Sequence, residues 1–125
     1  MKTHGLPKSE RIYLKEDFKN ILSAGKKVQI KGFTFWCRPN LGETSKPQIG
    51  IIVSKKLGSA VERNRCKRLL REAFRLNKHL LKNAAVLIYP KERELLSSLK
   101  AATEALLVLS EKAGIIRECE DPNFP

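Results

Sequence analysis

The 125-residue sequence lacks the features that mark a membrane-spanning or secreted protein. No apolar run approaches the roughly 18 residues that a membrane-spanning helix needs. Residues 1–7 contain no apolar segment of the kind found in signal peptides. The three cysteines, Cys37, Cys66 and Cys119, are odd in number and far apart, so they form neither a Cys-x-x-Cys metal motif nor a disulfide framework. We therefore expect reduced thiols in a cytoplasmic protein.

Motifs that carry out catalysis are also missing. The sequence has no Gly-rich phosphate loop, no internal repeat, no paired catalytic carboxylates and no Ser/His/Asp set. His79 has no second ligand at metal-binding spacing, so we expect it at the surface and expect no metal site in the protein. Acidic residues are few, 13 against 25 lysines and arginines, and the formal net charge is +12. This surplus favours nucleic acid or an anionic membrane as the partner.

The positive charge is concentrated in residues 54–75. This segment of 22 residues holds eight basic residues against Glu62 and Glu72, a net +6 that is half of the total. Ser59 followed by Glu62 is a capping box, which predicts the start of a helix. Within that helix, one set of residues recurs with the spacing of a buried face and another lies opposite. The first set is Cys66, Leu69, Leu70 and Ala73, and the second is Asn64, Arg68, Arg71 and Arg75.

The outer side of this helix carries charge of one sign. A solvated helix face normally mixes both signs, so a single sign favours a polyanion, although a plain solvated face remains the alternative. Lys55 and Lys56 precede the amino end of the helix, where free backbone N–H groups and the helix dipole suit a phosphate.

Hydrophobic patterns on either side of the basic helix predict a single α+β domain. Phe33, Phe35 and Cys37 alternate with polar neighbours, as in a strand with one buried face. We expect the order helix, three strands, helix, strand, helix, which makes an α+β sandwich with one sheet. The flanking helices are predicted at 16–24 and 98–113 and the strands at 27–30, 33–38, 48–54 and 84–89. The domain would span residues 1–115, with a flexible basic arm at 1–10 and a disordered acidic tail at 116–125.

Two aromatic positions leave alternatives open. Trp36 lies on the face of its strand opposite to Phe35, either covering the edge of the core or offering a platform on which an unpaired base stacks. Phe18, Ile21 and Leu22 share one face of the first helix. We expect Ile21 to be buried in the core.

The basic helix and its surroundings resemble the bacterial ribonuclease P protein subunit. The matching residues are Lys55-Lys56, then Ala60-Val61-x-Arg63-Asn64-Arg65-x-Lys67-Arg68, then Arg71-Glu72-x-Phe74. Asp17-Phe18 matches a further pair of that family, whereas Leu22 stands where an aromatic residue is common, which leaves apolar contact with a base in place of stacking. The resemblance covers about residues 10–114. It implies the order α-β-β-β-α-β-α, one four-stranded sheet and a left-handed β-α-β crossover.

The same resemblance implies a function. The protein would bind the catalytic RNA subunit and the 5′ leader of precursor tRNA, and would assist endonucleolytic removal of that leader. The RNA would perform the hydrolysis with Mg²⁺ held by RNA and substrate, so no protein residue is catalytic and neither a membrane nor a small molecule is a partner. A non-catalytic ribosomal or RNA-chaperone protein is the alternative, and a DNA-binding module is a further one. The implied RNA-subunit contacts are Lys55, Lys56, Arg63, Asn64, Arg65, Lys67, Arg68 and Arg71, and the implied leader contacts are Phe18, Leu22, Trp36 and Lys67.

Overall fold

A computed structural model of the chain describes residues 10–12, 15–30, 32–39, 47–92 and 96–116. Within these ranges the elements follow the predicted order α-β-β-β-α-β-α. Most of the expected basic arm and acidic tail lies outside the described residues. The elements are α1 (Lys15–Ala24), β1 (Lys26–Ile30), β2 (Phe33–Pro39), β3 (Gln48–Ile51), the short 3-10 helix η2 (Lys55–Leu57), α2 (Ala60–Asn77), the 3-10 helix η3 (Lys78–Leu80), β4 (Ala84–Pro90) and α3 (Leu99–Ala113).

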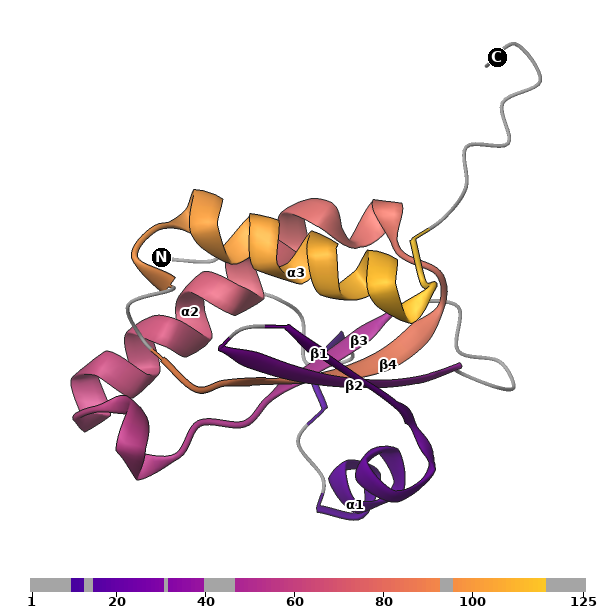
Figure 1. The fold of residues 1–125 in the computed structure, drawn as a ribbon, viewed down its shortest axis with the longest axis horizontal. Helices are drawn as coiled ribbons and strands as arrows, with labels where there is room; N and C mark the ends of the chain where they lie inside the picture. The colour runs from indigo at the N-terminus through magenta and orange to yellow at the C-terminus, as the bar shows by residue number, and fades with distance from the viewer. Residues whose placement is uncertain (1–9, 13–14, 31, 40–46, 93–95, 117–125) are drawn as a thin grey trace, which may run out of the picture.

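The four strands form one mixed sheet, as predicted, in the order β1-β2-β4-β3. β1 and β2 are antiparallel, as are β2 and β4, whereas β3 and β4 are parallel and are connected through α2. Helices α2 and α3 cover one face of the sheet and α1 covers the other (Figure 1). The left hand of the crossover stays a prediction of the resemblance.

The capping box predicted for α2 is present. The Ser59 hydroxyl accepts a hydrogen bond from the backbone N–H of Glu62 at 3.2 Å, and the Glu62 carboxylate accepts one from the backbone N–H of Ser59 at 2.9 Å. Helix α3 ends at Gly114, whose φ of 78° is a left-handed conformation that favours glycine. These local signals fix where α2 begins and where α3 ends.

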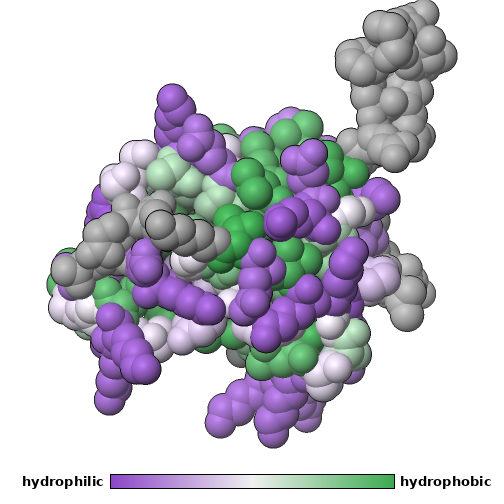
Figure 2. All heavy atoms as spheres, in the orientation of Figure 1, coloured by the Kyte–Doolittle hydropathy of each residue, from purple (hydrophilic) through white to green (hydrophobic). Residues whose placement is uncertain are grey.

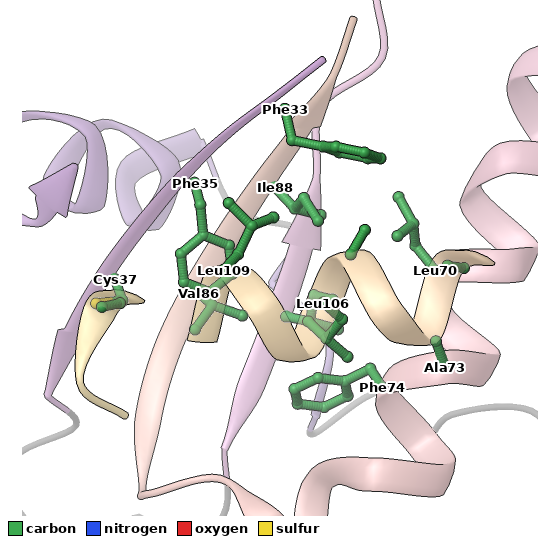
Figure 3. Close-up of a cluster of buried hydrophobic side chains, with 14 of the residues drawn as sticks. Phe33, Phe35, Cys37, Leu70, Ala73, Phe74, Val86, Ile88, Leu106 and Leu109 are labelled. Atoms are coloured by element: carbon green, nitrogen blue, oxygen red, sulfur yellow. The ribbon is translucent and has the colours of Figure 1, made fainter. Parts of the chain in front are cut away.

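The main core lies between the sheet and the pair α2 and α3 (Figure 3). Phe33, Phe35 and Cys37 are buried on this face, as their alternation predicts. From the helix side, Phe74 of α2 and Leu106 of α3 are fully buried and pack over the strands. The sequence pattern did not single out Phe74 as a core residue.

A second, smaller core lies beneath α1. Ile12, Ile21 and Leu87 are buried there with Ala85, and Phe18, Trp36 and Ile52 pack against them while remaining partly exposed. Ile21 is fully buried, as predicted. This face of the sheet is therefore only partly covered, and its aromatic residues keep some exposure.

Strand β3 is shorter than predicted, ending at Ile51 rather than residue 54. The backbone N–H of Ile52 still donates to the carbonyl of Ile88 at 2.9 Å. In a parallel ladder the next hydrogen bond would run from residue 90 to the carbonyl of Ile52, but Pro90 has no N–H. The ladder therefore stops here, and the chain turns toward η2.

Candidate nucleic-acid interface

The predicted contacts on α2 and η2 form what we call the basic surface. In Figure 2, hydrophilic side chains project at the lower left, around the end of α2 that Figure 1 places there. Some of the predicted contacts have exposed side chains, and others are half-buried against the fold. The exposed ones are Lys55, Lys56, Asn64, Arg65 and Arg68, and the half-buried ones are Arg63, Lys67 and Arg71.

The two lysines before α2 are held by an anchored turn. Leu57, the last residue of η2, is buried, so Lys55 and Lys56 stay exposed beside the amino end of the helix. The capping box already uses the backbone N–H groups of Ser59 and Glu62. The capping box leaves the two backbone N–H groups between Ser59 and Glu62 unused, because the first hydrogen bond within the helix is donated by Arg63. The expectation that this helix end offers both N–H groups and lysines to a phosphate therefore stays a prediction.

Arg65 has a structural role that the sequence did not reveal. Its guanidinium donates to the carbonyl of Leu96 at 3.0 Å and to the carbonyl of Ser97 at 2.8 Å. It thereby ties α2 to the segment that leads into α3. A guanidinium has five N–H donors, so the remaining ones are still available to RNA.

The acids on α2 neutralise little of the basic surface. Glu72 accepts two hydrogen bonds from Arg75, at 3.0 and 2.6 Å, and these hydrogen bonds raise the pKa of Arg75. Burial, followed by the nearby charge of Arg11, lowers the pKa of Arg71. Thus Arg75, which the pattern placed on the outer face, is paired within the chain, whereas Arg71 faces another cation.

A second set of side chains lies on the opposite face of the sheet and forms what we call the aromatic surface, made of Phe18, Leu22, Lys27 and Trp36. The strand register aligns Lys27, Trp36, Leu87 and Gly50 in one row across the four strands. The Lys27 ammonium lies 6.0 Å from the centre of the Trp36 ring, at the limit of a cation–π contact.

The two interpretations of Trp36 both find support in its position. One part of the side chain packs against the small core beneath α1, and the rest is exposed. Leu22 is 42% exposed and available for apolar contact. Arg38 lies two residues from Trp36 on the same face of β2, as its alternation with Cys37 predicts, although it is not among the predicted leader contacts.

The structure groups Phe18, Leu22 and Trp36 but does not bring Lys67 to them. Lys67 belongs to α2, whose buried side packs in the main core, whereas Trp36 packs in the core on the other side of the sheet. The assignment of Lys67 to the leader therefore stays a prediction, and its position favours the RNA-subunit contact.

No group of three or more His, Cys, Asp or Glu side chains that could hold a metal ion occurs within the described ranges. Across the same ranges, no helix is both long and apolar enough to cross a bilayer.

The fold and the charge distribution together define a class: a small basic α+β protein whose one crossover helix presents cationic side chains suited to a polyanion. The Ribonuclease P family model matches residues 6–114. The chain belongs to the family of bacterial ribonuclease P protein components. That family supplies the protein component of an endoribonuclease of tRNA processing, which is a ribonucleoprotein.

Individual relatives agree over most of the chain. The ribonuclease P protein component of Dictyoglomus turgidum is 39% identical over 116 residues, which cover 90% of this chain and 95% of the relative. The structure of the Staphylococcus aureus RNase P protein matches with a TM-score of 0.77 and 28% identity, covering 88% of this chain and all of that one. The RNase P protein of Thermotoga maritima matches with a TM-score of 0.72 and 32% identity, covering 82% and 96%.

Proposed function

We propose that the protein binds the RNA subunit of ribonuclease P through the basic surface and the 5′ leader of precursor tRNA through the aromatic surface. The observation that carries this proposal is the unbalanced charge of α2. The helix carries two acids, Glu62 and Glu72, against six basic side chains, and Glu72 forms an ion pair with Arg75, which lies outside the basic surface. The other cations of the helix are left to meet an external polyanion.

The two surfaces suit two kinds of RNA. Folded RNA is recognised largely through phosphates and shape, which arginines on a rigid helix can contact. Unpaired RNA is held by stacking and charge, for which Phe18, Trp36 and Lys27 supply the groups. We therefore assign Lys55, Lys56, Arg63, Asn64, Arg65, Lys67, Arg68 and Arg71 to the RNA subunit, and Phe18, Leu22 and Trp36 to the leader.

The chemistry would belong to the RNA. Mg²⁺ held by the RNA subunit and the substrate would activate water for hydrolysis of the phosphodiester. The protein neutralises phosphates and positions the leader, which lowers the Mg²⁺ concentration that the complex needs. This work would take place in the cytoplasm, where precursor tRNA is matured.

Reconstitution tests the proposal. The protein is added to a bacterial ribonuclease P RNA at a Mg²⁺ concentration too low for the RNA alone, with a precursor tRNA as substrate. We expect cleavage at the mature 5′ end to be restored, with no cleavage by the protein alone. RNA binding without restored cleavage would favour a ribosomal or RNA-chaperone role, and cleavage by the protein alone would refute the assignment of the chemistry to RNA.

A further inference from the structure

Three residues near the amino end of the chain, Glu10, Arg11 and Ile12, are held against the free edge of β3. The backbone N–H of Ile12 donates to the carbonyl of Ile49 at 2.8 Å, and Arg11 forms an isolated parallel bridge with Ile49. The Glu10 carboxylate is buried and forms an ion pair with Lys78 at the carboxyl end of α2. This segment therefore has a fixed position on the fold.

The pairing decides which way Arg11 faces. Ile12 packs in the small core beneath α1, and successive side chains of an extended segment point to opposite faces. Ile49, the bridge partner of Arg11, packs in the main core beneath α2 and α3. Arg11 therefore projects on the α2 side of the sheet, next to the edge strand on which α2 packs.

Arg71 of α2 is half-buried and lies close enough to Arg11 for the two positive charges to interact. Burial and, second to it, the positive charge of Arg11 lower the pKa of Arg71. The neighbouring acids pair with other bases, Glu10 with Lys78 and Glu72 with Arg75. Within the described ranges, neither Arg11 nor Arg71 forms an ion pair with a carboxylate.

Two guanidinium groups placed in this way repel one another in the free protein. An anion between them would turn that repulsion into two charge-assisted contacts, and the planar donor array of arginine matches a phosphate. The fold supplies the rigidity that such a site needs, because Arg11 is fixed by the β3 edge and Arg71 by a helix.

We propose that Arg11 and Arg71 together clamp one phosphate of the RNA subunit, so that the basic surface continues from α2 across the edge of β3. This inference rests on the proposed function and adds to it Arg11, which is not among the residues that carry the resemblance to the family. It assigns the phosphate to the RNA subunit rather than to the leader because both arginines lie on the α2 side of the sheet.

A double-mutant cycle tests the clamp. Affinity for a bacterial ribonuclease P RNA is measured as a function of salt for the wild type, Arg11→Gln, Arg71→Gln and the double variant. We expect each single variant to lose about tenfold in affinity and the double variant to lose clearly less than the product of the two losses. Because one phosphate is shared, the salt slope should fall by about 0.7–0.9 in either single variant and by no more than that in the double.

A second measurement separates a binding role from a structural one. Arg11→Gln removes the repulsion with Arg71, so the Tm of the free protein should stay the same or rise while RNA affinity falls. The clamp would be overturned if the affinity loss of the double variant equalled the product of the two single losses. It would also be overturned if the salt slope of the double variant fell twice as far as that of either single variant. So would a Tm of Arg11→Gln that falls in step with its affinity.

Lys112→Gln is the matched control, since it removes one exposed positive charge from the last turn of α3. That end of α3 lies near β1, at the edge of the sheet opposite to β3. We expect it to leave affinity and salt slope close to the wild type. A wild-type protein that does not bind the RNA would refute the proposed function itself. A wild type that binds, combined with additive losses in the cycle, would refute only the clamp.

Discussion

The ring of Phe18 in α1 lies directly over Gly50 in β3. A β-carbon at position 50 would come within 3.0 Å of Cζ of Phe18 and within 2.6 Å of Cδ2 of Leu87. The absence of a side chain at this position thus lets the first helix approach the sheet and seats the Phe18 ring. One backbone position therefore controls where half of the aromatic surface lies.

Gly50→Ala should displace both Phe18 and Leu87. We expect the free energy of unfolding to fall by about 1–3 kcal/mol, as for other overpacked cores. Precursor tRNA with a leader should also bind less tightly, whereas mature tRNA should not. Gly114→Ala is the control: it strains a left-handed turn in open space, so it should lower stability without changing leader binding. Unchanged leader affinity in Gly50→Ala would remove Phe18 from the leader site.

Trp36→Ala tests the stacking interpretation of the aromatic surface. Loss of a base-stacking platform should weaken the binding of precursor tRNA by about 1–3 kcal/mol per stacked base and leave the binding of mature tRNA unaffected. Binding is measured with a matched pair of substrates that differ only in the leader. Trp36→Phe should recover most of the affinity, because it keeps an aromatic face. Equal losses for both substrates would show that Trp36 serves the core alone.

Alanine substitutions of Arg65 and Arg68, which lie on the same helix, should have different effects on stability but both should weaken RNA binding. Arg68→Ala removes an exposed side chain, so RNA affinity and its salt dependence should fall while the Tm holds. Arg65→Ala also breaks the hydrogen bonds to Leu96 and Ser97, so we expect a loss of about 1–2 kcal/mol in stability as well. Thermal unfolding and RNA titration on both variants check this, and equal Tm values would contradict the tie to α3.

Cys37 should make stability depend on alkaline pH. Burial raises the pKa of this thiol, with the Lys26 charge partly offsetting the effect. The folded state then holds the proton more tightly than the unfolded state. Stability is therefore fully present below the pKa of the unfolded thiol, about 8.5, and declines as pH rises through and above it. The Tm of wild type and Cys37→Ala is compared between pH 7 and 10; the wild type should fall more steeply, and parallel curves would refute the effect.

The sequence predicted those parts of the fold that depend on local signals. Alternation at Phe33, Phe35 and Cys37 gave the buried face of β2, and the pair Ser59 and Glu62 located the start of α2. The element order and the single sheet follow from such patterns, because each pattern depends only on a few neighbouring residues.

Features that depend on residues distant in the chain were not predictable in this way. The early end of β3 is set by Pro90, which lies on the neighbouring strand. The carbonyl partners of Arg65 follow it by about thirty residues, and the position of Arg11 depends on an edge pairing with Ile49. Charge counting identified the basic surface, but only tertiary contacts show which of its cations are already engaged.

The position of β4 in the sheet has a consequence for synthesis of the chain. β4 is the strand that joins the β1–β2 hairpin to β3, and it is translated after α2. On a ribosome, the hairpin and β3 therefore emerge as separate pieces with open edges, and α2 emerges before there is a completed sheet to pack on. Insertion of β4 closes both ladders at once, so the nascent protein acquires a fixed RNA-facing helix only when its last strand has left the exit tunnel.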